Sequence, residues 1–194
     1  MIIGIDADGV LTDMSGFNYK YGEIFWGRKP VNPAGYTTAE IFRVSRGQEF
    51  MFGLKYFYEY CCKLQPRKQA FEVNHRLNSD GHVLYGITAR KFAIMKNPLG
   101  CLSRHLFKRW INNNKLHFED IFFCSESNTP AEKLDFCKQI SAEIMIDDKP
   151  DVALFLAENG IAVLLFDAPY NKEVKHKNII RVFDWDEIYC HISK

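Results

Sequence analysis

Short apolar runs alternate with mixed polar and apolar stretches along most of the chain. Runs of this length are typical of β-strands that are buried on both faces. They occupy residues Met1–Ile5, His82–Ile87, Asp120–Cys124, Glu143–Ile146, Ile161–Phe166 and Ile179–Phe183. Helices are predicted between them over Arg67–Ser79, Ser103–Asn113, Ala131–Ile140 and Asp151–Asn159. Pro66 and Pro130 precede two of these helices, and Gly81 and Gly160 follow two.

This alternation of strands and helices predicts the fold class. Parallel strands need crossover connections, which are usually helices, and these helices cover both faces of the sheet. We therefore predict an α/β protein with a Rossmann-like, three-layer parallel sheet.

One interval breaks the alternation. About 75 residues separate the first predicted strand from the second, whereas a crossover needs only about a dozen. Within this interval residues 15–63 are dense in aromatic side chains and are interrupted by glycine and proline. We predict a core domain formed by residues 1–14 and 65–194, with a small helical cap over residues 15–64 at the carboxyl edge of the sheet.

Composition narrows the class of protein. The 194 residues are 47% hydrophobic and 25% charged, which is typical of a soluble globular domain. The formal net charge of +1 gives no general attraction to a nucleic acid polymer or an anionic membrane, and no stretch approaches the roughly 18 apolar residues of a membrane span. The six cysteines show no Cys-x-x-Cys pair and are expected to be reduced thiols. A cytoplasmic protein is expected, and no feature specifies an oligomeric state.

Polar residues follow four of the predicted strands at the point where each strand ends. They are Asp6 and Asp8, then Thr88-Ala89-Arg90, then Ser125, then Asp147-Asp148. In an open α/β sheet, ligands bind outside the carboxyl ends of the strands, so these groups are expected to converge. Carboxylates from two strands suit Mg²⁺. The Thr88 hydroxyl, backbone N–H groups of the turns and Lys133 suit a phosphoryl group beside the metal.

These residues, in this order, resemble the four motifs of the haloacid dehalogenase (HAD) superfamily. The motifs are DADGVLTD at residues 6–13, Thr88 in GITAR, Lys133, and Asp147-Asp148 in IDDKPD. The resemblance implies that Asp6 is the nucleophile and forms an aspartyl phosphate, and that Asp8 is the general acid and base. It implies that Thr88, the Ala89 backbone and Lys133 bind phosphoryl oxygens.

The same resemblance implies a Mg²⁺ site. The ligands would be Asp6, the backbone carbonyl of Asp8 and an acid of the fourth motif. We favour Asp148 as the direct ligand and Asp147 as a supporting residue.

An acid at position 8 distinguishes the chain from the ATP-driven pumps and the dehalogenases of the superfamily, which leaves phosphatases and phosphomutases. Within that group DADGVLTD and IDDKPD resemble the 5'(3')-deoxyribonucleotidase-type family and its bacterial relatives, which implies hydrolysis of a nucleoside monophosphate. Those nucleotidases commonly carry Thr-Ser at the second motif, whereas this chain has Thr88-Ala89-Arg90. A sugar phosphate or another small phosphometabolite is the alternative substrate. Two other functions are possible for the same set of acids, Thr and Lys: a receiver-like signalling module and a catalytically idle phosphate-binding protein.

Four further residues are candidate substrate contacts. Arg90 could contact phosphate or pair with an acid. One or two aromatic rings of the predicted cap could face the cleft and stack on a nucleobase, and Phe17, Tyr19 and Trp26 are the nearest in sequence to the first motif. An individual ring of such a cap is more often part of its core than a ligand contact.

Overall fold

The computed structural model describes residues 1–193. Over that range six parallel strands form one sheet in the order β3-β2-β1-β4-β5-β6. The strands are β1 (Ile2–Ile5), β2 (Val83–Thr88), β3 (Ile121–Phe123), β4 (Ile144–Asp147), β5 (Ala162–Phe166) and β6 (Ile179–Val182). All six lie where the apolar runs predicted them, so the predicted Rossmann-like sheet is confirmed. The order reverses beside β1, which lies between β2 and β4.

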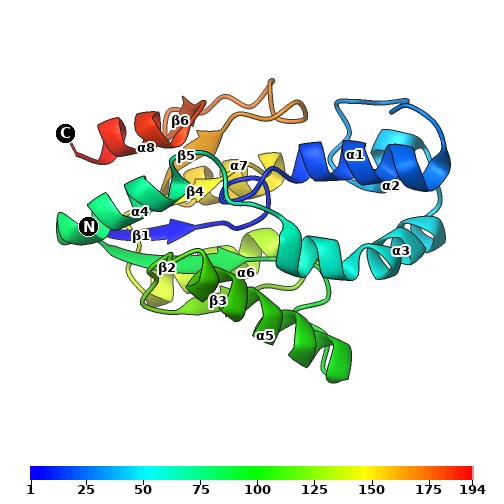
Figure 1. Ribbon diagram of the computed structural model, residues 1–194. Helices are drawn as coiled ribbons and strands as arrows, with labels where there is room; N and C mark the ends of the chain where they lie inside the picture. The colour runs from blue at the N-terminus through cyan, green and yellow to red at the C-terminus, as the bar shows by residue number, and fades with distance from the viewer. Residues whose placement is uncertain (194) are drawn as a thin grey trace.

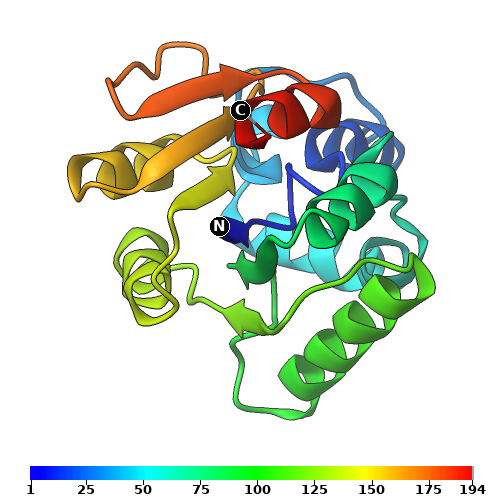
Figure 2. The same ribbon diagram turned by 90° about the vertical axis from the view of Figure 1, so that its left-hand side faces the viewer.

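Helices cover both faces of the sheet, as Figure 2 shows. The helices of the sheet region are α4 (Ala70–Ser79), α5 (Pro98–Asn113), α6 (Thr129–Gln139), α7 (Pro150–Glu158) and α8 (Trp185–Ile192). Successive side chains of a strand point to opposite faces. Ile146 of β4 accordingly packs in a cluster with residues of α4, α5 and α8, and its neighbour Met145 packs in a second cluster with residues of α6 and α7.

The predicted helices differ from the structure at α4, which begins at Ala70 and not at Arg67, and at α5 and α8. Helix α5 begins at Pro98 and not at Ser103, because the Asn97 side chain accepts a hydrogen bond from the Gly100 N–H at 2.9 Å and caps the helix. Helix α8 was not predicted. It is short, and the Asp184 side chain caps it by accepting from the Glu187 N–H at 2.8 Å.

The segment between β1 and α4 forms further helices beyond the carboxyl ends of the strands (Figure 1). They are α1 (Met14–Trp26), α2 (Thr38–Phe42), α3 (Arg46–Lys55) and the π-helix η1 (Glu59–Lys63). We call these four elements the inserted helices. Phe17, Phe52 and Tyr60 form their aromatic centre. The inserted helices therefore have a hydrophobic cluster of their own above the edge where the predicted site residues converge.

Within residues 1–193, no helix has the length and hydropathy that crossing a membrane requires.

Candidate active site

The loop after β1 is folded tightly on itself. The Asp6 N–H donates to the Ile146 carbonyl at 2.9 Å, so Asp6 continues the pairing of β1 with β4. The N–H groups of Leu11 and Thr12 both return to the carbonyl of Ala7, at 2.9 and 3.1 Å. These bonds hold Asp6 and Asp8 on a rigid support at the end of the central strand.

Three carboxylates and one ammonium group lie together below this loop. Nζ of Lys133 lies 2.7 Å from an oxygen of Asp6 and 2.7 Å from an oxygen of Asp147. Each of Asp6, Asp147 and Asp148 contributes one carboxylate oxygen to a group in which all three atoms lie within 4.8 Å of one another. All four side chains are buried. These residues are widely separated along the chain, at positions 6, 133, 147 and 148, and the fold brings their side chains together.

The charges of this group are unbalanced. Burial raises the pKa of Asp6 to about 7, although the nearby Lys133 ammonium lowers it. Burial, together with the charges of Asp6 and Asp147, raises the pKa of Asp148 well above its ordinary value. Burial alone would lower the pKa of Lys133, but the two carboxylates outweigh it and raise that pKa, so Lys133 stays cationic. One ammonium faces three acids, and the site favours an additional cation.

Asp147 and Asp148 differ in how their oxygens are used. Asp147 accepts from Lys133 with one oxygen and from the Lys149 N–H, at 2.9 Å, with the other. Asp148 accepts from the Tyr170 hydroxyl with Oδ2, while its Oδ1 is buried and finds no hydrogen-bond partner within residues 1–193. Asn171 donates to the Asp148 carbonyl at 2.7 Å and fixes the backbone there. Asp148 is therefore the acid that keeps an oxygen free for a ligand.

Asp8 does not contact Lys133 and has partners of its own. Its Oδ1 accepts from Nη1 of Arg90 at 2.6 Å, and its Oδ2 accepts from the Tyr60 hydroxyl. Arg90 is fully buried. The sequence left two roles open for Arg90, contact with phosphate and pairing with an acid. In the structure Arg90 pairs with an acid, Asp8.

A cavity of about 690 Å³ lies between the sheet edge and the inserted helices. Its wall includes all the predicted acids, namely Asp6, Asp8, Asp147 and Asp148, together with Thr88, Ala89 and Lys133. The Thr88 hydroxyl is buried and unpartnered within the described chain, so it is free to donate to a ligand. This cavity is the candidate active site.

The three aromatic residues predicted as candidate substrate contacts do not all lie at the cavity. Phe17 lines the cavity. Tyr19 and Trp26 are not among its described lining residues: the Tyr19 hydroxyl donates to the Pro33 carbonyl at 2.5 Å, and the Trp26 ring stacks on Phe52 at 5.1 Å in the aromatic centre. Arg90 is not among the lining residues either.

Sequence reasoning missed two tyrosines that hold the acids. Tyr170 lies in the loop after β5, at the same edge of the sheet as Asp6, but it does not directly follow the strand, which ends at Phe166, so the rule of polar groups at strand ends did not single it out. Tyr60 lies in the inserted helices, 52 positions from its partner Asp8, and no local pattern marks it. Tyr36, whose ring meets Tyr170 edge-on at 5.0 Å, also lines the cavity.

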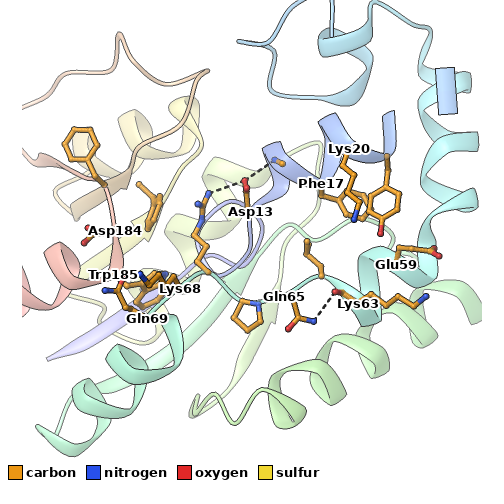
Figure 3. Close-up of a pocket in the computed structure, with 17 residues that line it drawn as sticks. Asp13, Phe17, Lys20, Glu59, Lys63, Gln65, Lys68, Gln69, Asp184 and Trp185 are labelled. Carbon is orange, nitrogen blue, oxygen red and sulfur yellow. Dashed lines mark hydrogen bonds and ion pairs between the residues drawn. The ribbon is translucent and has the colours of Figure 1, made fainter. Parts of the chain in front are cut away.

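A second cavity, of about 770 Å³, lies between α1, the segment before α4 and the start of α8 (Figure 3). Asp13, Lys20, Lys63 and Trp185 are among the residues around it. Among the predicted site residues, only Phe17 reaches its described wall. Its described charged groups are exposed or partly exposed side chains of both signs, and it lacks the convergent buried acids of the candidate active site.

Comparison with known proteins identifies the family. The family model described as 5' nucleotidase, deoxy (pyrimidine), cytosolic type C protein (NT5C) matches residues 1–194. The chain belongs to this family. A nucleotidase of Clostridium acetobutylicum is 26% identical over 193 residues, which cover 99% of this chain and 93% of the relative.

Solved structures agree on the fold of this NT5C-family chain. A HAD family hydrolase from Deinococcus radiodurans R1, with bound phosphate and sodium, matches with a TM-score of 0.65 at 12% identity over 99% of this chain and 94% of that one. A heptose bisphosphate phosphatase from B. bronchiseptica, complexed with magnesium and phosphate, matches with a TM-score of 0.59 at 10% identity over 99% and 97% of the two chains. The predicted superfamily is confirmed, and the chain is a nucleotidase-like HAD phosphatase.

Gly9 allows the loop after β1 to approach Asp148 closely. Gly9 has φ +94°, and a Cβ there would lie 1.9 Å from Oδ2 of Asp148. Gly9→Ala should lower the free energy of unfolding by about 3 kcal/mol, measured by urea denaturation, and should abolish phosphatase activity, because both strain and overlap result.

Gly27→Ala is the matched control. Gly27 also has a positive φ, of +62°, but a Cβ there meets nothing within 4 Å. It should cost only about 1 kcal/mol and leave activity intact. Equal losses in the two variants would contradict the argument from overlap.

Proposed function

We propose that this chain is a Mg²⁺-dependent phosphomonoester hydrolase that acts on nucleoside monophosphates through an aspartyl phosphate on Asp6. The observation that carries the proposal is the buried group of Asp6, Lys133, Asp147 and Asp148 in one cavity with Asp8 and Thr88. A nucleotidase family model that matches residues 1–194 supports the substrate class.

The residues fit a magnesium ion. Their ligand atoms are carboxylate oxygens, which Mg²⁺ prefers, and among residues 1–193 the three buried acids face a single Lys, Lys133. Asp6, the Asp8 backbone carbonyl and the free Oδ1 of Asp148 would hold the ion. Asp147 would instead orient Lys133, since both of its oxygens already accept hydrogen bonds. A bound Mg²⁺ would supply positive charge that offsets the phosphoryl oxygens and the acids.

The chain's own residues divide the reaction between them. Lys133 binds Oδ1 of Asp6, and the other oxygen attacks phosphorus. The bond from phosphorus to the leaving oxygen breaks, and Asp8 gives that oxygen a proton. Asp8 then takes a proton from a water, whose oxygen attacks the phosphorus of the aspartyl phosphate and releases inorganic phosphate and Asp6. Thr88, the Ala89 N–H and Lys133 bind the phosphoryl oxygens during both steps.

The inserted helices act as a cap, which we assign to residues 15–64, with residues 1–14 and 65–194 as the core. They contribute aromatic and polar residues to one side of the cavity, including Phe17, Phe50 and Glu49. Aromatic faces suit stacking on a nucleobase, and the cavity volume of about 690 Å³ is within the range of small-molecule sites. This lining favours a nucleoside over a simple sugar as the leaving group.

Asp6→Asn tests the nucleophile. The substitution removes the attacking carboxylate with little change in volume, so phosphate release should fall at least about 10³-fold. The matched control is Asp151→Asn, because Asp151 lies in the first turn of α7, close to the acids of β4 in sequence, but has a side chain that is 56% exposed. Comparable phosphate release from Asp6→Asn and wild type would contradict an aspartyl phosphate on this residue.

Removal of metal tests the cation site. Dialysis against EDTA should abolish phosphate release, and added Mg²⁺ should restore it. Asp148→Asn should raise the Mg²⁺ concentration that gives half-maximal rate by about tenfold or more, because it removes the acid with a free oxygen. Full activity of the metal-free protein would rule out the Mg²⁺ requirement.

A substrate panel tests the leaving group. Values of kcat/KM for deoxyribonucleoside and ribonucleoside 5'- and 3'-monophosphates should exceed those for hexose and triose phosphates by about tenfold or more, since stacking contributes about 1–3 kcal/mol per base. A preference for the sugar phosphates would replace the nucleotide assignment with the alternative substrate class.

A further inference from the structure

The two carboxylate oxygens of Asp8 are held from different sides. Oδ1 accepts from Nη1 of Arg90 at 2.6 Å, and Oδ2 accepts from the Tyr60 hydroxyl. Asp8 and Tyr60 line the candidate active site, whereas Arg90 does not belong to its described wall. Oδ1 therefore points to the protein interior, and Oδ2 points to a residue of the cavity wall.

The Arg90 side chain is buried, and four groups contact its guanidinium. Its side chain is 0% exposed. Nη2 donates to the Tyr60 carbonyl at 2.9 Å, and the guanidinium lies over the rings of Tyr60 and Phe107, 4.1 and 4.5 Å from their centroids. Burying a cation is costly unless such partners surround it. A guanidinium fixed by a carboxylate, a carbonyl and two rings holds that carboxylate in one orientation.

Tyr60 connects this pair to the inserted helices. It lies in η1, a π-helical turn of a kind that is frequent at functional sites. Its ring packs 6.0 Å from the Phe17 ring in the aromatic centre, while its hydroxyl and its carbonyl meet Asp8 and Arg90. One residue of the inserted helices therefore bonds to both members of the Asp8–Arg90 pair.

We propose that Arg90 and Tyr60 are positioning residues for Asp8. The inference rests on the proposed function, in which Asp8 protonates the leaving oxygen. Arg90 holds Oδ1 and prevents rotation of the carboxyl group, so that only Oδ2 can serve the reaction. Tyr60 holds Oδ2 at the cavity wall, where the leaving oxygen arrives. Both residues act through Asp8, and Arg90 does so without reaching the substrate.

The test compares two phosphate esters that differ in their need for a general acid. An alkyl ester, such as the best nucleoside monophosphate of the panel, has a strongly basic leaving oxygen that must be protonated. The weakly basic leaving group of p-nitrophenyl phosphate departs without a proton. The ratio kcat/KM reports the steps through departure of the leaving group, so it isolates this difference.

Tyr60→Phe and Arg90→Lys are the informative variants. Tyr60→Phe should lower kcat/KM for the alkyl ester about tenfold and Arg90→Lys about 100-fold, since a positioned general acid contributes about 10²–10⁴-fold. For p-nitrophenyl phosphate, each variant should lose less than about threefold. Tyr60→Phe removes one oxygen only, so it provides the test even if Arg90→Lys fails to fold, which thermal unfolding would reveal.

Two control variants match these changes. Tyr21→Phe removes a hydroxyl from the same aromatic cluster, at a residue outside the described wall of the candidate active site. Arg76→Lys alters a guanidinium that also lies over a ring, 3.6 Å from the Tyr189 centroid, on α4. Both controls should leave the ratio between the two esters at the wild-type value.

A selective loss for the alkyl ester supports the inference. An equal loss for both esters in Tyr60→Phe would indicate a structural role only and would overturn it, as would no loss for either ester. Failure of the wild-type protein to hydrolyse either ester, with Mg²⁺ present, would instead overturn the proposed function and this inference with it.

Discussion

The candidate active site depends on one buried ammonium group. Lys133 bridges Asp6 and Asp147 at 2.7 Å each, and all three side chains are shielded from water. Acids at the ends of β1 and β4 repel each other and lose hydration when buried, and a shared cation offsets both costs. Removing one partner of a buried pair costs roughly 3–5 kcal/mol. The pairing of β1 with β4 brings the acids together, and α6 supplies the lysine.

The core of this arrangement could be predicted from the sequence because it depends on local patterns. Buried parallel strands are continuous apolar runs, and a polar residue directly after such a run lies at the carboxyl edge. Asp6, Thr88 and Asp147 each stand at such a position, so their convergence follows once the strands are recognised. Lys133 lies in a helix and not at a strand end, so the strand-end rule does not reach it; its place near the start of the helix after β3 and the resemblance to the HAD motifs made it a candidate.

The partners of the acids could not be predicted in this way. The Tyr60 hydroxyl meets Asp8 across 52 positions, through a π-helical turn whose geometry depends on how the aromatic residues of the inserted helices pack. An aromatic-rich stretch predicts a cluster but not which ring faces the cavity. All three aromatic residues nearest the first motif were candidate contacts. Trp26 and Tyr19 pack elsewhere, whereas Phe17 lines the cavity. The role of Arg90 likewise depends on which group lies beside it in the folded chain, and that group is Asp8.

The predictable residues and the unpredictable ones belong to two different halves of the site. The half that we propose binds phosphate stands on strand ends, whose positions are set by backbone hydrogen bonds of the sheet. The half that we propose binds the leaving group stands on short helices held together by aromatic contacts. Asp8 belongs to both halves: its backbone lies in the motif loop and its side chain is bound by Tyr60. In the proposed mechanism, proton delivery by Asp8 would therefore depend on the packing of the inserted helices, and substitutions there would change the rate as well as the specificity.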